Sequence, residues 1–488
     1  MKRRTRTEYI FFLLLGAITF LVSSWTLRGN FYFLFDDIAW IKEVKFSFNI
    51  NNFFTIFPTS RYNDRPLRTF WFWCMYQIFG MNYTAYYLVI LLWHVANTYL
   101  VFVWIYQILI ICKNGENIFW KSILVAIIFG VYSKNLMAVY WISGAANDLL
   151  CGFFCLLSML SYLKYMNNRK SRISAIFYIG FYVCAMRSKE AAICLPIIIL
   201  LFELYVSCVI KKERAKISIF NVISIIYMFL YLIRIITLPE GVTFEGQYKQ
   251  DFSISTIWGT LLNYIRMYFA WDDGNFSYDI NNYYTKVGNI GILICIVIII
   301  ILASNIIQKR KLKQSIGLIV VFMAVGLAFA PLLVLPNIQH LLYFYFPAIF
   351  LALLFGLSLY NGIMFLFPLK YCAQIICGVT MILLLFLNNS GGAKAIRENF
   401  IFWGQEALST VKDIDKIAEL PEGSHIYIYG ADGDVNVFNY APGYVVNIIY
   451  DDDTLIPELG TSETQFIIPY AIWEYTNGHV IETERVMY

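Results

Sequence analysis

Long apolar segments recur along most of the chain, and short charged islands separate them. A helix needs roughly 20 apolar residues to cross the hydrocarbon core of a bilayer. By that measure we predict about eleven spans: 9–27, 85–111, 118–134, 137–163, 173–187, 191–210, 216–237, 289–307, 315–335, 341–360 and 365–388. Only 14% of the 488 residues are charged, whereas a soluble domain holds about 25%. The chain is therefore expected to be an all-α polytopic membrane protein.

The distribution of lysine and arginine predicts how these spans are oriented. Basic residues favour short cytoplasmic loops, and they cluster at the N-terminus and in the islands 167–172, 211–216 and 308–313. With the N-terminus in the cytoplasm, all three islands fall on the same side. The loops 28–84 and 238–288 and the tail then lie outside. The first apolar run has no small-residue cleavage site after it, so we interpret it as a retained span. The net charge of +5 comes from these loops and does not indicate nucleic acid.

The last part of the chain, 389–488, has a different pattern. Helical spacing of apolar residues over 398–420 ends at a Pro-Glu-Gly turn. Short β-branched or alternating runs follow at 425–429, 444–450 and 465–468, with turn residues between them. We therefore expect a small extracytoplasmic α/β domain at 389–488, after a transmembrane domain at 1–388.

Ten cysteines are present, and nearly all of them lie inside predicted spans. Only Cys74 falls in an outward segment, and no CxxC spacing occurs. The cysteines are therefore interpreted as small packing residues. The sequence gives no reason to expect a metal site or a cofactor.

Candidate catalytic groups appear at the start of the first outward loop. Asp36 and Asp37 directly follow an aromatic run at 31–35. Carboxylates beside a membrane face are costly unless they are paired or used, and partial burial raises a carboxylate pKa towards that of a general base. A solvated loop start or a helix cap is the alternative. Later in the loop, Arg65 precedes Pro66 at the interface, where a phosphate group would lie. Interfacial anchoring by snorkelling is the alternative there.

Further polar residues lie at the outer ends of later spans. Asp148 follows a short Ser-Gly-Ala-Ala-Asn stretch, and Arg187-Ser188-Lys189-Glu190 forms a tight outward turn between two apolar runs. This turn is interpreted as an internal charge cluster, with surface pairing of Lys189 and Glu190 as the alternative. His340 lies at the outer edge of a late span, where a structural hydrogen-bonding role is the alternative to a catalytic one.

The order of these motifs resembles the opening of the transmembrane O-mannosyltransferases that carry tetratricopeptide repeats. The resemblance runs patchily over 30–350 and rests on the segments 33–38, 64–70, 78–97, 143–150, 187–192 and 340–344. More broadly, the chain is similar to the GT-C superfamily. Two features depart from the pattern: the chain has no tetratricopeptide repeats, and Asn147 stands where that family often has an arginine. The acceptor and the identity of the sugar therefore stay open.

The resemblance implies a GT-C-like membrane glycosyltransferase in the cell membrane. Its donor would be a polyprenyl-phosphate-linked sugar, and its acceptor an extracytoplasmic protein or glycan. Asp36 would be the general base in an inverting displacement, and Asp37 would orient it or bind the acceptor. The resemblance also implies a substrate-binding set around the leaving phosphate, consisting of Arg65, Arg187, Lys189, Glu190, Asp148 and His340.

Other classes of protein predict different patterns. A transporter or flippase of lipid-linked sugars should show polar residues at mid-membrane depth or interrupted helices in repeated halves, and neither is evident in the sequence. A polysaccharide polymerase or ligase would place its arginines in a large late outward loop, whereas the largest outward loop here is the first. A non-catalytic scaffold leaves the acidic loop and the basic clusters unexplained.

Overall fold

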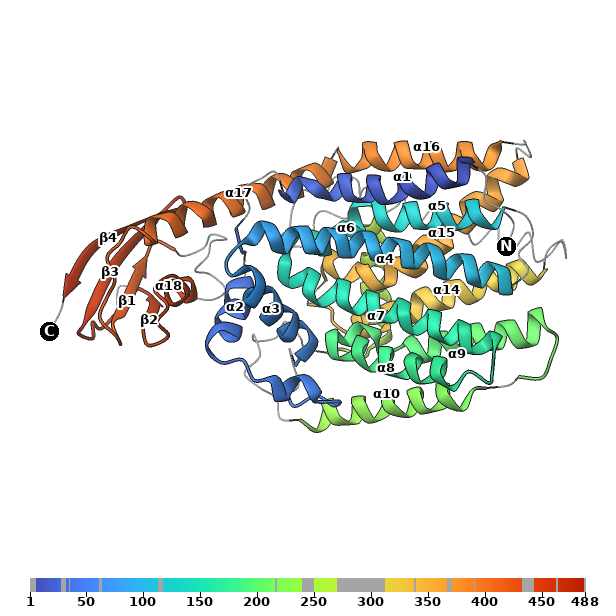
Figure 1. The fold of residues 1–488 in the computed structure, drawn as a ribbon, viewed down its shortest axis with the longest axis horizontal. Helices are drawn as coiled ribbons and strands as arrows, with labels where there is room; N and C mark the ends of the chain where they lie inside the picture. Colours follow the sequence, from blue (N-terminus) through green and yellow to red (C-terminus); the bar gives the residue numbers. More distant parts are fainter. Residues whose placement is uncertain are drawn as a thin grey trace.

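In the computed structural model, long helices form a bundle, and a small lobe of strands and helices lies beyond one end of it (Figure 1). The structure describes residues 6–27, 32–34, 36–60, 64–112, 117–215, 217–238, 250–269, 312–337, 339–366, 371–389, 391–431, 443–461 and 464–486. The predicted span 289–307 and most of the predicted outward loop 238–288 lie outside these residues.

Most of the described helices belong to the bundle. They are α1 (Arg6–Ser23), α4 (Tyr83–Ile111), α5 (Ile118–Val131), α6 (Ser133–Tyr140), α7 (Ile142–Asn167), α8 (Arg172–Ser188), α9 (Leu195–Leu204), α10 (Ile219–Thr237), α11 (Ile254–Phe269), α14 (Leu312–Leu333), α15 (Tyr345–Leu366) and α16 (Cys372–Asn388), with one-turn helices at Ser24–Leu27 (η1), Glu190–Ala192 (η3) and Leu341–Phe344 (η5) and a π-helix at Tyr205–Ile210 (η4). Within the described part of the chain, seven helical segments are long and apolar enough to cross a membrane, or eight if the bent pair α5–α6 is one span. The chain is a multi-pass helical membrane protein, as its sequence predicts.

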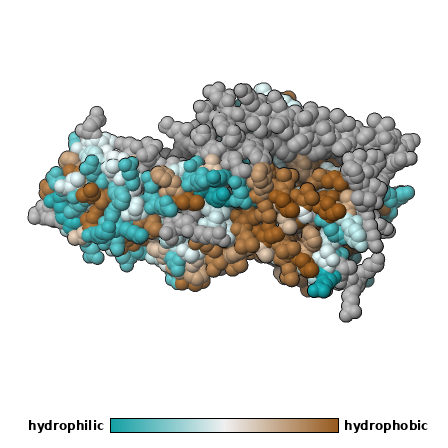
Figure 2. Space-filling model, turned by 90° about the horizontal axis from the view of Figure 1, so that it is seen from above, coloured by the Kyte–Doolittle hydropathy of each residue, from teal (hydrophilic) through white to brown (hydrophobic). Residues whose placement is uncertain are grey.

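The surface of the bundle supports this assignment. Hydrophobic residues form a broad area over the bundle, whereas hydrophilic residues dominate around the lobe (Figure 2). Along α10, large apolar side chains are exposed at Ile223, Ile226, Phe229 and Ile233. A row of this kind on one helix face is what lipid chains cover in a membrane protein.

One predicted boundary is wrong, because the span expected at 137–163 starts later. The chain bends by 50° between α5 and α6, and α7 starts only at Ile142. The sequence showed no interrupted helix, because no proline marks this bend. A break leaves carbonyl groups at the end of α5 without helical partners. Side chains from elsewhere take their place: Asn135 donates to the carbonyls of Ile128 and Phe129, Asn388 donates to that of Val131, and His94 Nε2 lies 3.1 Å from that of Gly130.

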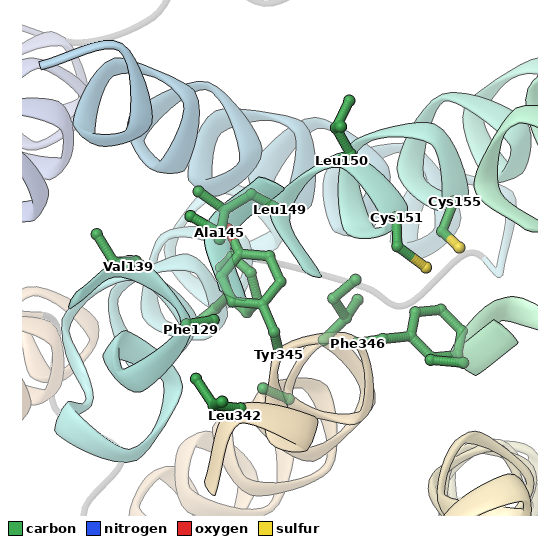
Figure 3. Packing of buried hydrophobic residues seen from close by; sticks show 14 of the residues in the cluster. Phe129, Val139, Ala145, Leu149, Leu150, Cys151, Cys155, Leu342, Tyr345 and Phe346 are labelled. Atoms are coloured by element: carbon green, nitrogen blue, oxygen red, sulfur yellow. The ribbon is translucent and has the colours of Figure 1, made fainter. Parts of the chain in front are cut away.

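The core of the bundle forms around Tyr345 of α15, which lies among Phe129, Ala145 and Leu149 (Figure 3). Its hydroxyl lies 2.9 Å from His94 Nδ1 and accepts a hydrogen bond of 3.0 Å from Asn97. α7 approaches this ring closely at Gly152, where a Cβ atom would be 2.9 Å from the ring. These hydrogen bonds pair His94 and Tyr345 inside the bundle, where an unpaired polar group is costly.

The predicted first outward loop contains α2 (Asp37–Phe46), η2 (Ile50–Phe54) and α3 (Pro66–Phe79). Proline at the first position of α3 suits a helix start, because the first N–H of a helix needs no helical partner. These helices lie at the end of the bundle that faces the lobe (Figure 1). The loops that carry the basic islands 167–172 and 211–216 lie at the other end. At that end the buried Glu203 accepts hydrogen bonds from Arg169 (2.7 Å) and Tyr162 (2.5 Å).

The lobe follows the long helix α17 (Gly391–Ile414), which extends away from the bundle (Figure 1). Its four strands, β1 (His425–Tyr429), β2 (Ile456–Leu459), β3 (Tyr470–Thr476) and β4 (His479–Val486), form a sheet in the order β2-β1-β3-β4. β1 is parallel to β2 and β3, and β4 is antiparallel to β3. The sheet and its helices confirm a small α/β lobe.

Two of the predicted strands are wrong. The run 444–450 forms helix α18 (Tyr444–Ile449), in which Val445, Val446 and Ile448 are buried. Packing of these side chains against the lobe overrides the strand preference of β-branched residues. The run 465–468 is not a strand, and β3 starts after Pro469. Proline has no N–H to donate to a sheet, so it favours the position before a strand.

The lobe contacts the bundle through α2. Lys42 Nζ donates to Asn447 Oδ1 at 3.0 Å, and Lys45 Nζ donates to the carbonyl of Ile448 at 3.0 Å. Lys45 also forms an ion pair of 2.7 Å with Asp451. The lobe therefore docks on the helix that starts at the predicted catalytic acids.

Candidate active site

Asp37, the first residue of α2, is hydrogen-bonded to the start of α7. Its carboxylate is fully buried; Oδ2 accepts the N–H of Leu34 at 3.0 Å, and Oδ1 accepts the N–H of Ser143 at 2.7 Å. Trp141, the N-cap residue of α7, makes no side-chain cap of its own. Asp37 thus caps this helix from another segment, where the helix dipole favours a negative charge. Both carboxylate oxygens of Asp37 are used in holding the fold.

Asp36 is held differently. Its Oδ2 accepts hydrogen bonds from Trp40 Nε1 at 3.1 Å and from Ser143 Oγ at 3.0 Å. Its Oδ1 is buried and makes no hydrogen bond to any residue that the structure describes. Asp36 therefore has one oxygen fixed by the protein and the other free to accept a proton.

The two neighbouring carboxyl groups differ in their electrostatic surroundings. Burial raises the pKa of Asp36, while the hydrogen bond from Trp40 and the charge of Arg68 partly offset that rise. Burial raises the pKa of Asp37 well above its usual range, and the neighbouring charge of Asp36 raises it further. A positive charge thus favours ionisation of Asp36, whereas a negative charge opposes ionisation of Asp37.

Arg68 is a charged residue of this region that the sequence reasoning did not select. It is only 1% exposed, and its guanidinium carbon lies 3.3 Å from the centroid of the Trp40 ring. Burial lowers its pKa to about 9, so the side chain stays protonated at neutral pH. The signal in the sequence was its spacing, because Arg65 and Arg68 lie three residues apart around a helix start and thus on the same side of it. Trp40 and Ser143 carried no comparable signal.

The predicted cations each contact a carboxylate. Arg65 pairs with Glu190 at 2.9 Å, Arg187 with Asp64 at 3.0 Å, and Lys189 with Asp148 at 2.6 Å. Arg187 also donates to the carbonyl and hydroxyl of Thr55, the C-cap residue of η2. Because 64–65 and 187–190 are short contiguous stretches, these pairs bring all three cations together. The three cations thus lie near one another at the lobe-facing end of the bundle, with carboxylates between them.

His340 lies at the same end of the bundle. Its Nδ1 accepts the N–H of Leu342 at 3.1 Å and caps the one-turn helix η5. Burial, with a contribution from the charge of Lys189, lowers the pKa of His340 to about 4. The imidazole is therefore neutral at pH 7 and adds no positive charge to the cluster. Lys189 Nζ also lies 4.6 Å from the centroid of the Tyr343 ring, close to His340 in sequence.

No group of three or more His, Cys, Asp and Glu side chains is placed to hold a metal ion in the described part of the chain. The described cysteines form no disulfide, and most of them are buried or half-buried.

Comparison with known proteins identifies the architecture. No family model and no curated protein matches the sequence. Among solved structures, the chain is similar to an oligosaccharyltransferase of Archaeoglobus fulgidus in its apo form, with a TM-score of 0.50 and 9% identity over 91% of this chain. The chain spans 64% of the length of that protein. It is also similar to ArnT from Cupriavidus metallidurans bound to undecaprenyl phosphate, with a TM-score of 0.49 and 11% identity over 94% of this chain and 87% of that one.

The chain shares the helical fold of that oligosaccharyltransferase. At 9% identity the similarity establishes the fold, and a fold by itself hosts different reactions. The reaction must therefore be argued from the side chains at the lobe-facing end of the bundle.

Proposed function

We propose that this chain is an integral membrane glycosyltransferase. It would transfer a sugar from a polyprenyl-phosphate-linked donor to an acceptor on the outer side of the membrane, with inversion at the anomeric carbon. The observation that carries the proposal is the geometry of Asp36, whose Oδ2 is fixed by Trp40 and Ser143 while its Oδ1 has no partner among the described residues. The fold shared with the oligosaccharyltransferase and the order of the motifs give independent support.

In the proposed reaction, Oδ1 of Asp36 removes the proton from the attacking acceptor group. The acceptor atom bonds to the anomeric carbon while the bond from that carbon to the phosphate oxygen breaks. The electron pair of that bond leaves with the lipid phosphate. General-base assistance of this kind contributes about 10²–10⁴-fold to a rate, and fixed cations near the leaving oxygen stabilise the charge that develops there.

The ion pairs fit this role, because they hold the cations in place before the lipid arrives. A guanidinium carries five N–H donors; Arg187 uses Nε and Nη2 on Thr55 and Asp64, and its Nη1 makes no hydrogen bond to any residue that the structure describes, so it can donate to a phosphate. Arg65 uses Nε and Nη2 on Glu190. In this proposal Glu190 and Asp148 position Arg65 and Lys189, whereas Arg65, Arg187 and Lys189 contact the phosphate.

The proposal also assigns roles to Asp37, Arg68 and His340. Asp37 positions the base by fastening α2 to α7 and does not bind the acceptor. The positive charge of Arg68 favours the ionised form of Asp36 against the effect of burial. His340, neutral at pH 7, maintains the start of η5.

We further propose that the end of the bundle bearing Asp36 and the lobe faces outside, with the N-terminus in the cytoplasm. The support is the lysine and arginine in the islands 167–172 and 211–216, which lie at the opposite end. On this basis residues 1–388 form the transmembrane domain and 389–488 an extracytoplasmic one. The donor then reaches the site from the outer leaflet.

Mass spectrometry of surface glycans and glycoproteins tests the function. Cells that lack the gene, and the same cells complemented with the natural protein or with Asp36→Asn, should be compared. The natural protein should restore one sugar modification, and Asp36→Asn should not, although it inserts at the same level. A modification that persists without the gene, or that Asp36→Asn restores fully, would contradict the proposal.

A further inference from the structure

A cavity of about 240 Å³ lies in the first outward segment, between α2, η2 and α3. Its walls include Trp40, Glu43, Phe48, Asn52, Arg65 and Arg68. We call it the loop cavity. It lies beside the proposed active site, because Trp40 forms part of its wall and also donates its indole N–H to Asp36.

The loop cavity and Asp36 share one face of α2. Asp36, Trp40 and Glu43 are four and three residues apart, which places them on the same side of a helix. Seven residues of α-helix rise on the order of 10 Å, so Glu43 lies about two turns from the base along one stripe. A molecule in this cavity would extend along α2 toward Asp36.

Glu43 is a charged group of the loop cavity to which the proposed transfer reaction assigns no role. It is half-buried, and its carboxylate makes no hydrogen bond or ion pair with any residue that the structure describes. Burial raises the pKa of Glu43, and the charge of Arg68 opposes this rise. A carboxylate in a cavity wall can accept hydrogen bonds from a ligand that carries hydroxyl groups.

The composition of the walls indicates which ligand that is. Arg68 covers one face of the Trp40 ring and Phe48 stacks on Trp73, so the weakly positive C–H groups of a sugar ring would contact the aromatic surface that these neighbours leave. The carboxylate of Glu43, the amide of Asn52 and the guanidinium of Arg65 offer both acceptors and donors to hydroxyl groups. A lipid tail would leave these polar groups unsatisfied. The cavity holds the volume of about eight water molecules, which suits one sugar unit better than an extended peptide.

We propose that the loop cavity is a saccharide subsite, and that the acceptor of this enzyme is a glycan whose sugar unit next to the reacting one binds there. Glu43 accepts hydrogen bonds from the hydroxyl groups of that unit, and Trp40 separates it from the base. This inference rests on the proposed glycosyltransferase function and adds the class of its acceptor.

Binding of defined sugars to the full-length protein in lipid nanodiscs tests the proposal. The probes are the methyl glycosides of glucose, galactose, mannose, N-acetylglucosamine and N-acetylgalactosamine and their common disaccharides, observed by saturation-transfer NMR. At least one probe should bind the natural protein and Asp36→Asn alike. Glu43→Ala should bind that probe about 10- to 100-fold more weakly, because it loses hydrogen bonds to a charged group. Glu398→Ala, at an exposed position of α17, is the matched control and should bind normally.

Several outcomes would overturn the inference. They are the absence of binding by every probe, binding that Glu43→Ala leaves unchanged, and equal weakening in the Glu398→Ala control. Mass spectrometry of the transferred sugar separates this inference from the function itself. A sugar attached directly to a polypeptide side chain would refute the glycan acceptor and leave the transferase intact. Normal sugar transfer by Asp36→Asn would refute the proposed transferase mechanism, irrespective of the result of the sugar-binding experiment.

Discussion

Replacing each of the two neighbouring acids with asparagine should separate catalysis from folding. In Asp36→Asn, the amide oxygen can still accept from Trp40 and Ser143, and the amide N–H₂ group points to the position where Oδ1 has no partner. The fold should therefore persist while the base is lost. A general base contributes about 10²–10⁴-fold, which corresponds to about 2.7–5.4 kcal/mol of transition-state stabilisation.

Asp37→Asn should behave in the opposite way. Both of its oxygens accept backbone N–H groups, from Leu34 and Ser143. An amide has one oxygen, so its N–H₂ group must face one of these donors inside a buried site. Leaving a buried donor unsatisfied costs about 1–3 kcal/mol. We expect Asp37→Asn to lower the thermal stability of the purified protein and to lower activity less than Asp36→Asn does.

The assay is the initial rate of sugar transfer at matched protein levels, with thermal unfolding in nanodiscs measured for each variant. The pH dependence gives a second readout, because the base must be deprotonated to act. The rate should rise with pH through the pKa of Asp36, which burial places above the usual aspartate value of about 3.9. This rising limb should disappear in Asp36→Asn. A stable Asp37→Asn that loses activity as fully as Asp36→Asn would show that the roles are reversed and would refute this reasoning.

Three further predictions concern orientation, the donor site and the lobe. With Cys208, which is exposed, and Cys295 replaced, Glu422→Cys should react with a membrane-impermeant maleimide added to intact cells and Lys170→Cys should not; labelling of both from one side would contradict the orientation. Arg187→Ala should weaken binding of undecaprenyl phosphate, measured by native mass spectrometry, since charge-assisted hydrogen bonds to phosphate are lost, and unchanged affinity would exclude Arg187 from the phosphate site. Lys45→Ala should increase hydrogen exchange in α18, because it removes a hydrogen bond of 3.0 Å and an ion pair of 2.7 Å. The increase should be modest, since the ion pair with the largely exposed Asp451 contributes no more than about 1 kcal/mol. Unchanged exchange would show that the lobe docks through other contacts.

The sequence by itself determined the membrane class and the α/β character of the tail. Both follow from composition and from periodicity over many residues. The length of an apolar segment determines whether it can span a bilayer, and the placement of charged residues determines its orientation. Local pattern was less reliable where packing dominates. The run 444–450 has strand-forming residues and forms α18, because burial of one of its faces in the lobe outweighs a propensity of at most about 1 kcal/mol.

Only the tertiary structure decided how the charged residues are used. Nothing local distinguishes Asp36 from Asp37, which are adjacent and chemically identical. They differ because Ser143, far along the chain, donates its N–H to one and its hydroxyl to the other. In the same way, Arg187 meets Asp64 and Lys189 meets Asp148 only once separate helices pack together. Periodicity carries information about which face of a helix is buried, whereas a partner across the bundle depends on contacts that no local pattern contains.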